Sequence, residues 1–270
     1  MKIAVCVVGK EENKYIKEYI EYYKNIGIDK IFLYDNNEID GECFEGYLNQ
    51  YIKNNFIELI NFRGLFKPQK RAYYDCYNNN KNYFDWIAFF DLDEYLYVEN
   101  YTNLKDFLSL SKFNNCSSIL FNWRYYGDNN EIFYHPKPLQ QRFKIPVNKS
   151  FNNPHYFAAA KSIVKGKLIN ITWQLFPHFL KNNNICRPNG TIILNPFSSP
   201  QYEIGYIKHY ATKSTEEYAL KLMKGTVNSR VNNFKKFLLK KINNFYFFLN
   251  RKTKKKKSLF KKMLGINIKD

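Results

Sequence analysis

The segment Asp91-Leu92-Asp93-Glu94 carries three carboxylates directly after the apolar run Trp86–Phe90. Carboxylates at this spacing converge on one cation if the strand ends there and the chain turns. Hard divalent cations such as Mg²⁺ and Mn²⁺ take oxygen ligands and bridge carboxylates to phosphate oxygens. Such an ion neutralises the charge of a diphosphate leaving group, which assists transfer reactions that release one. Asp-x-Asp also occurs in exposed acidic turns, so the surrounding elements have to decide between a metal site and a solvated turn.

The first third of the chain alternates short apolar runs with amphipathic segments. We expect Asn13 to cap the first helix and Gly27 to end it. The periodicity predicts strands at 2–8, 30–35, 56–62 and 86–90, with helices at 13–26 and 69–82. This order is typical of an α/β fold with a mostly parallel sheet flanked by helices.

Ligands of such sheets bind beyond the carboxyl ends of the strands. Three of the predicted strand ends are polar, and two of them are acidic: Gly9-Lys10-Glu11, Asp35-Asn36-Asn37 and Asp91-Leu92-Asp93. The acidic segment after the fourth strand therefore lies where a site is expected, which favours the metal site over the solvated turn.

Three ordered motifs resemble the glycosyltransferase family 2 and family 92 group, whose fold is of the GT-A (Rossmann-like) type. The motifs are Val8–Asn37 with its opening Gly9-Lys10-Glu11-Glu12, Asp85–Leu96 with the acidic segment, and Lys208–Tyr218. The resemblance covers residues 1–226. It departs from the commoner pattern at Gly9-Lys10, where Arg-Asn is more usual.

The resemblance implies a nucleotide-sugar donor of the UDP type, a Mn²⁺ or Mg²⁺ cofactor and inversion at the anomeric carbon. It implies that Asp91, Asp93 and His209 hold the metal, with His178 as an alternative to His209. The residues implied to contact the nucleotide or its diphosphate are Glu11, Glu12, Asp35, Gln69, Lys70, Arg71 and Asp91.

Inversion needs a general base that takes a proton from the acceptor hydroxyl. The candidates are Glu94, Asp128 and Glu131, of which Asp128 is favoured because it follows the stretch Asn122–Gly127, which resembles an acceptor-side segment of the group. An exposed loop acid is the alternative interpretation of Asp128.

The middle of the chain is less regular. We predict a strand at 118–126 and an α+β acceptor-side region from 143 to 200, where several prolines interrupt short apolar runs. Ser214-Thr215-Glu216-Glu217 predicts a capping box at the start of a short helix that ends near Gly225.

The five cysteines are scattered and odd in number, without the short spacings of a zinc or redox motif. This argues against a disulfide framework and suits a reducing cytosol. The apolar run that opens the chain is too short for a signal peptide or a membrane span. We therefore expect a cytoplasmic protein.

The net charge of +18 is concentrated at the C-terminus, because residues 230–270 hold 14 Lys or Arg and one acidic residue. We predict a GT-A domain at 1–226 and a basic extension at 227–270, with an amphipathic helix at 231–250 and a bare tetralysine run at Lys254–Lys257. Residues 231–262 suit the anionic inner face of the cell membrane. A solvated tail is the alternative, and nucleic-acid binding is disfavoured because the rest of the chain has no basic cluster.

The sequence thus predicts a peripheral, metal-dependent glycosyltransferase that modifies a glycan or glycolipid acceptor, such as a lipopolysaccharide or capsule precursor. A nucleotidyltransferase is a rival, but no Gly-rich phosphate loop follows Val8. A non-catalytic sugar- or membrane-binding protein is the second rival, and the intact acidic pair and His209 argue against it.

Overall fold

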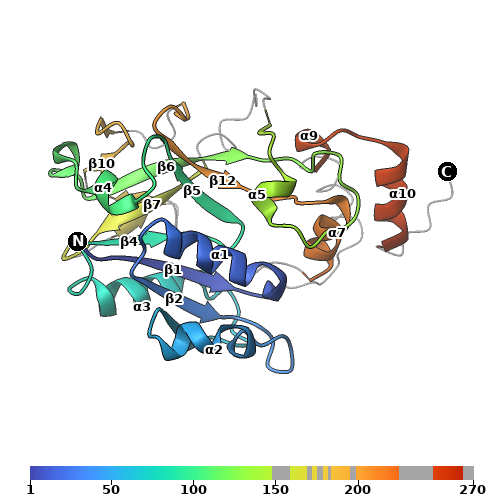
Figure 1. The fold of residues 1–270 in the computed structure, drawn as a ribbon, viewed down its shortest axis with the longest axis horizontal. Helices are drawn as coiled ribbons and strands as arrows, with labels where there is room; N and C mark the ends of the chain where they lie inside the picture. The colour runs from blue at the N-terminus through green and yellow to red at the C-terminus, as the bar shows by residue number, and fades with distance from the viewer. Residues whose placement is uncertain are drawn as a thin grey trace. The chain divides into compact units, whose positions relative to one another are not determined.

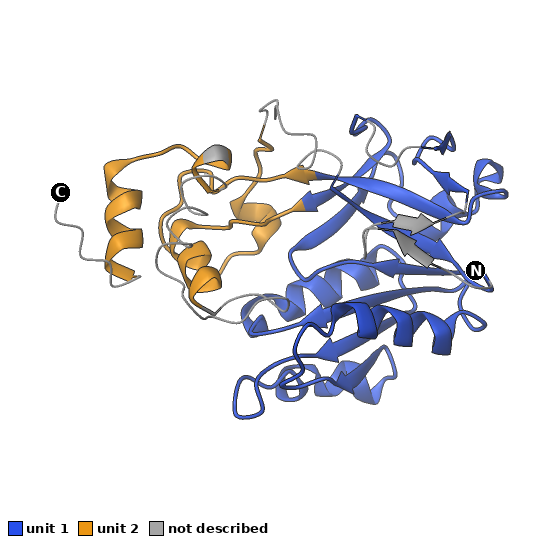
Figure 2. Ribbon diagram, turned by 180° about the vertical axis from the view of Figure 1, so that it is seen from behind, with its two compact units in different colours: residues 1–123, 151–208 blue, residues 124–150, 209–270 orange. Residues whose placement is uncertain are grey.

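A computed structural model describes residues 1–147, 159–168, 172–174, 179–181, 184–194, 199–224 and 246–263 of the chain. The chain forms two compact units, coloured separately in Figure 2. Unit 1 comprises Met1–Trp123 and Phe151–Lys208, and unit 2 comprises Arg124–Ser150 and His209–Asp270. In the described residues, no helix has both the length and the apolarity to cross a membrane.

Unit 1 is built on one large sheet (Figure 1). Its path runs β11-β10-β6-β7-β4-β1-β2-β3, and β12 pairs with β5 and β6. The strands of the parallel half are β1 (Ile3–Gly9), β2 (Lys30–Asp35), β3 (Ile57–Asn61) and β4 (Trp86–Phe89). The strands β5 (Glu94–Val98), β6 (Ser118–Tyr125), β7 (Ala160–Lys165), β10 (Ile185–Cys186), β11 (Ile192–Ile193) and β12 (Gly205–His209) complete it. β7 runs antiparallel to both β4 and β6.

Two helices cover opposite faces of the parallel strands, because consecutive strand residues point to opposite sides. Phe89 packs on Tyr73 of α3 (Gln69–Asn80), with ring centroids 5.0 Å apart. Its neighbour Phe90 stacks on Tyr23 of α1 (Asn13–Asn25) at 5.7 Å. The sheet is therefore buried on both sides up to the residue that precedes Asp91.

The predicted α/β fold class is confirmed, and the six elements expected before residue 91 are present within a few residues of the predicted bounds. Gly27 ends α1 with a φ of 93°, which favours glycine. Asn13 was expected as the N-cap, but it is the first helical residue, and the cap position belongs to Glu12, whose side chain makes no capping hydrogen bond.

Further elements were not anticipated. They are the helices α2 (Glu45–Lys53), α4 (Leu104–Leu108) and α5 (Leu139–Arg142), the 3-10 turn η1 (Ser111–Phe113), the strand β5, and a two-stranded sheet of β8 (Thr172–Gln174) and β9 (Phe179–Lys181). β5 was missed because the acidic segment looks like the end of an element, whereas the chain turns there and continues as a strand.

Unit 2 contains the predicted capping box. The Ser214 backbone N–H donates to Glu217 Oε2 (3.1 Å), and the Glu217 N–H donates to Ser214 Oγ (3.3 Å), at the start of α7 (Thr215–Lys224). Glu217 also forms a buried ion pair with Arg142 at 2.5 Å. The capping prediction is confirmed, with an additional tertiary contact.

The C-terminal segment is packed into unit 2. The predicted amphipathic helix at 231–250 lies outside the described residues up to 245, and α9 (Phe247–Leu249) follows. The expectation of a bare tetralysine run is wrong, since these lysines open α10 (Lys254–Met263) and Lys256 is buried. Phe260 of α10 forms a buried cluster with Tyr218, Ala219 and Tyr246, so α10 belongs to the core of this unit.

The cysteine interpretation also needs correction. Cys116 and Cys186 form a disulfide between chain positions 70 residues apart, whereas Cys6, Cys43 and Cys76 are free. β10 pairs in parallel with β6, which brings these distant segments together. Spacing rules detect only cysteines that are close in the sequence, whereas the pairing of β10 with β6 brings these two together in space.

Candidate functional site

The acidic segment forms a tight turn between β4 and β5. The Glu94 N–H donates to the Asp91 carbonyl (3.0 Å), and the Asp91 N–H donates to Glu94 Oε2 (2.9 Å). Leu92 at the centre of the turn approaches Gly9 at the end of β1, where an added Cβ would lie 3.0 Å from Leu92 and 2.8 Å from Phe44. Gly9, which differs from the more usual residue of the resembled group, therefore leaves the space that the turn occupies.

Lys161 on β7 brings a cation to the turn. Its Nζ lies 2.8 Å from Asp91 Oδ2 and 3.4 Å from Glu94 Oε2, and its side chain is 1% exposed. Burial alone lowers the pKa of Lys161, but Asp91 and Glu94 raise it to a net value above the ordinary one. Lys161 is therefore a permanent cation of this site.

The other oxygen of Asp91 is held by α3. Asp91 Oδ1 accepts hydrogen bonds from Gln69 Nε2 (3.0 Å) and the Tyr73 hydroxyl (3.3 Å). Asp91 thus has protein partners on both carboxylate oxygens, and its orientation is fixed by two elements. Gln69, which the sequence placed beside the nucleotide, is largely buried and positions the acidic turn.

Glu94 lies beneath the turn, with a side chain that is completely buried. Burial raises the pKa of Glu94 well above its usual range, while Lys161 opposes this rise. Among the described residues, Glu94 Oε1 is buried and has no hydrogen-bond partner. A buried acceptor without a partner is costly, so this oxygen suits a cation or a donor from a ligand.

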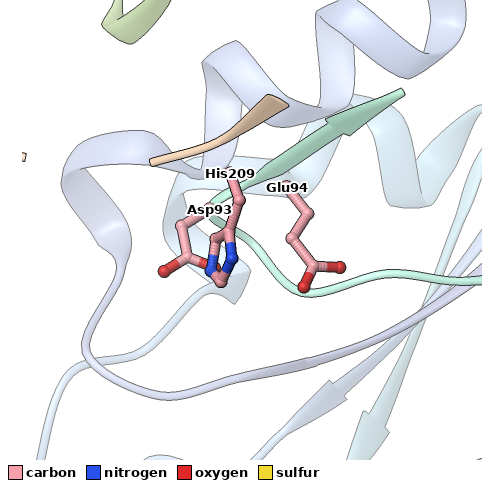
Figure 3. Close-up of side chains that lie close together, drawn as sticks. All are labelled: Asp93, Glu94 and His209. Carbon is pink, nitrogen blue, oxygen red and sulfur yellow. The ribbon is translucent and has the colours of Figure 1, made fainter. Parts of the chain in front are cut away.

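His209 is the last residue of β12. β12 pairs with β5. The Glu99 N–H, just after β5, donates to the Ile204 carbonyl, just before β12 (2.8 Å). The start of β5 therefore lies beside the end of β12. Asp93, Glu94 and His209 each offer one ligand atom, and these atoms lie within 4.8 Å of one another (Figure 3). The two carboxylates supply the oxygen ligands that Mn²⁺ and Mg²⁺ both take, and the imidazole nitrogen suits Mn²⁺ better than Mg²⁺.

This group differs from the expected metal set by one member. The group contains Glu94 and not Asp91, whose carboxylate oxygens contact Lys161 and α3. Asp91 as a direct ligand stays a prediction. His178 lies outside the described residues.

A second polar cluster lies at the end of β2. Asp35 accepts from Asn37 Nδ2 (2.7 Å) and from Arg63 Nη1 (3.2 Å). Arg63 also donates to the carbonyls of Glu38, Ile39 and Gly41, so it holds the loop after β2. Asp35 is buried and constrained in this way, and its predicted role beside the nucleotide stays a prediction.

The remaining predicted nucleotide residues lie at the helix starts. The Glu11 backbone N–H donates to Asn37 Oδ1 (2.7 Å), and Glu12 precedes α1. Lys70 and Arg71 are exposed on the first turn of α3, where Arg71 lies over the Phe62 ring at 5.4 Å. The structure brings Gln69 to the acidic turn and leaves Lys70 and Arg71 at the surface.

Two of the three general-base candidates belong to unit 2. Asp128 is buried rather than exposed, and its Oδ2 lies 2.5 Å from Lys256 Nζ and accepts from the Tyr246 hydroxyl. Glu131 accepts from Arg142 Nε at 2.9 Å. Both acids therefore have cationic partners, and only Glu94 lies in the acidic turn.

Sequence reasoning missed Lys161, Arg63 and Lys256, which bind three of the singled-out acids. For Lys161 a signal existed, since it is a lone lysine in the run Ala160–Val164, followed by Ser162 and two β-branched residues. No comparable signal pairs Arg63 with Asp35 or Lys256 with Asp128.

Comparisons with known proteins agree with the resemblance. A glycosyltransferase family 92 protein of Oryza sativa subsp. japonica is 27% identical over 106 residues, which are 39% of this chain and 18% of that protein. One of Ricinus communis is 24% identical over 105 residues, again 39% of this chain and 19% of the relative. The aligned segment thus spans about a fifth of these relatives' length.

Among solved structures, Staphylococcus aureus TarS is similar over 92% of this chain and 43% of its own, with 13% identity and a TM-score of 0.43. This is a weak likeness. The model of the family described as Glycosyltransferase family 92 matches residues 1–258, which continues past the boundary expected at residue 226. Because the match takes in nearly the whole sequence, the chain belongs to glycosyltransferase family 92.

Proposed function

We propose that this protein is a metal-dependent glycosyltransferase that takes a sugar from a nucleotide-sugar donor, of the UDP type, and transfers it with inversion. The observation that carries the proposal is that Asp93 and Glu94 of the acidic turn and His209 of β12 offer converging ligand atoms. Family membership supports the reaction class. Glu94 Oε1 has no hydrogen-bond partner in the part of the chain that the structure describes, which supports a ligand at this place.

In this proposal the protein supplies the electrostatics for leaving-group departure. Asp93, Glu94 and His209 would hold Mn²⁺ or Mg²⁺, which when bound neutralises the charge of a diphosphate. Gln69 and Tyr73 orient Asp91, and Lys161 adds a fixed positive charge. Preorganised charges of this kind need no rearrangement when charge develops on the leaving group.

Glu94 and Asp128 remain the proposed alternatives for the general base, and Glu94 would take this role only in place of binding the metal. Both oxygens of Asp128 have partners, since Oδ1 accepts from the Asn130 N–H (2.9 Å) and Oδ2 is bound by Lys256 and Tyr246. Glu94 has one oxygen without a partner among the described residues. This supports Glu94 as the acid that is available to a ligand.

The acceptor is proposed to be a glycan or glycolipid at a membrane surface, such as a lipopolysaccharide or capsule precursor. Support comes from the basic C-terminal segment, where Lys254, Lys255 and Lys262 of α10 are exposed. Exposed cations of this kind are attracted to anionic lipid. We propose peripheral association with the inner face of the cell membrane.

Calorimetric titration with UDP in the presence and absence of Mn²⁺ tests the proposal directly. We expect UDP to bind in a Mn²⁺-dependent manner, and a screen of UDP- and GDP-sugars to identify the donor by released nucleotide. Absence of metal-dependent nucleotide binding would overturn the proposal and favour a non-catalytic binding protein.

A further inference from the structure

Lys161 is a buried cation of the site for which the sequence predicted no role. Its ammonium contacts Asp91 Oδ2 and Glu94 Oε2 and lies 5.9 Å from the centre of the Trp123 ring. It is held in the middle of the sheet, because β7 pairs with β4 on one side and places Lys161 opposite Phe121 of β6 on the other. The charge therefore cannot move to solvent.

A fixed cation has opposite effects on the two ligands proposed for this site. It repels a divalent cation that approaches the acidic turn, and it attracts a diphosphate. It also occupies Asp91 Oδ2, while Gln69 and Tyr73 occupy Oδ1. An isolated metal ion thus meets a partly neutralised site, whereas a metal ion together with a diphosphate brings compensating negative charge.

We propose that Lys161 is a positioning residue that couples metal binding to donor binding: by holding Asp91 and neutralising part of the acidic turn, it makes Mn²⁺ bind tightly only together with the nucleotide diphosphate. This inference rests on the proposed function. Coupling of this kind is reciprocal, so the metal raises the affinity for the diphosphate by the same factor.

The test measures Mn²⁺ binding, and not activity, in variants that change the charge at Lys161 and Asp91. Mn²⁺ affinity is determined by electron paramagnetic resonance and calorimetry, first alone and then with saturating UDP. With Lys161→Met, Mn²⁺ alone should bind about fivefold or more tightly and the gain from UDP should shrink by a similar factor. With Asp91→Asn, Mn²⁺ alone should bind about fivefold or more weakly.

The double variant Asp91→Asn/Lys161→Met restores the charge balance of the Asp91–Lys161 pair, while buried Glu94 loses its contact with Lys161 as it does in Lys161→Met. Its affinity for Mn²⁺ alone should return to within about twofold of wild type, because the two variants change the charge near the metal by equal and opposite amounts. The matched control is Lys165→Met on the same strand, whose Nζ donates to the Asn114 carbonyl (2.8 Å) and which should behave as wild type.

The inference is overturned if Lys161→Met leaves both the Mn²⁺ affinity and the UDP coupling unchanged, or if the double variant stays as weak as Asp91→Asn. Should Lys161→Met fail to fold by circular dichroism, the comparison of Asp91→Asn with the double variant decides alone. A wild-type protein that binds no Mn²⁺ with UDP overturns the proposed function itself. A wild type that binds both, with variants that ignore the charge series, overturns the role of Lys161 only.

Discussion

The ammonium of Lys256 lies 2.5 Å from Asp128 Oδ2, and both side chains are buried. Tyr246 donates its hydroxyl to the same carboxylate oxygen, and Asn250 accepts from the Asp128 backbone N–H (2.6 Å). Three residues of the C-terminal segment therefore converge on one acid of unit 2. The basic segment is a structural part of this unit, in addition to any surface role of its exposed lysines.

Lys256→Met should destabilise unit 2 strongly. The substitution leaves the Asp128 carboxylate buried without its cation, which costs about 3–5 kcal/mol in comparable buried pairs. Urea unfolding monitored by circular dichroism gives the free energy of unfolding. Lys255→Met is the matched control because Lys255 is the exposed neighbour in α10. Equal stability of the two variants would contradict the buried ion pair.

Exposed lysines of α10 should govern binding to anionic vesicles. The triple variant Lys254→Gln/Lys255→Gln/Lys262→Gln should lower the vesicle partition coefficient by on the order of tenfold or more, since each cation near an anionic surface contributes to attraction. Co-sedimentation with phosphatidylglycerol vesicles measures this. Deleting residues 231–270 is a poorer test, because it removes Tyr246 and Phe260 from a buried cluster.

The control for the vesicle experiment removes the same charge from another helix. Lys14, Lys17 and Lys24 are exposed on α1, and their replacement by Gln should leave partitioning nearly unchanged. If both triple variants lose binding equally, the attraction reflects net charge alone and the proposed membrane face on α10 is wrong.

Asp93→Asn should remove metal-dependent nucleotide binding while the fold survives. Asp93 is one of the three residues whose ligand atoms converge, and loss of a charged ligand should weaken Mn²⁺ binding with UDP by about 100-fold or more. Calorimetry with UDP and Mn²⁺ is the measurement. Asp106→Asn, an exposed acid of α4 in the same unit, is the control, and equal binding by both variants would exclude Asp93 as a ligand.

Reduction of the Cys116–Cys186 disulfide should lower stability by about 4 kcal/mol, because it closes a loop across 70 residues. Thiol titration of the unfolded protein should find the three free cysteines before reduction and five after it. Cys43→Ser is the control, since Cys43 is exposed and unpaired. Five thiols in freshly purified protein would contradict the disulfide.

The sequence predicted elements well where one residue pattern determines one element. The strands β1 and β2 and the capping box at Ser214 follow from local periodicity and from side chains a few positions apart. The Asp91 motif was recognisable for the same reason. Lys161 stands out as a lone lysine in its run, but its partners could not be predicted, because they lie 70 and 67 positions away and are brought to it by the antiparallel pairing of β7 with β4.

The wrong predictions also concern residues whose contacts lie far away in the sequence. The Lys254–Lys257 run has the composition of a solvated tail, and only the tertiary position of Asp128 explains why one of its lysines is buried. Cys116 and Cys186 become neighbours through β10 and β6. Local chemistry was therefore predictable, whereas charge pairs and the disulfide depend on topology.

Tyr77 on α3 should make stability fall at alkaline pH. Burial raises the pKa of Tyr77 to about 12, although the hydrogen bond from the Leu168 N–H (3.2 Å) opposes this rise; its hydroxyl donates to the Lys165 carbonyl (2.7 Å). An unfolded tyrosine ionises near pH 10. The raised folded pKa means that the contribution of Tyr77 is fully present below about pH 10 and is lost as the pH rises toward 12.

Tyr77→Phe removes this titration. Between pH 10 and 12 the free energy of unfolding of wild type should fall more steeply than that of the variant, by about 1.4 kcal/mol per pH unit at most. Urea unfolding at pH 9, 10, 11 and 12 gives the two slopes. Tyr83→Phe is the control because Tyr83 is largely exposed, and its slope should match wild type. Parallel slopes for wild type and Tyr77→Phe would show that the Tyr77 hydroxyl ionises equally in the folded and unfolded states.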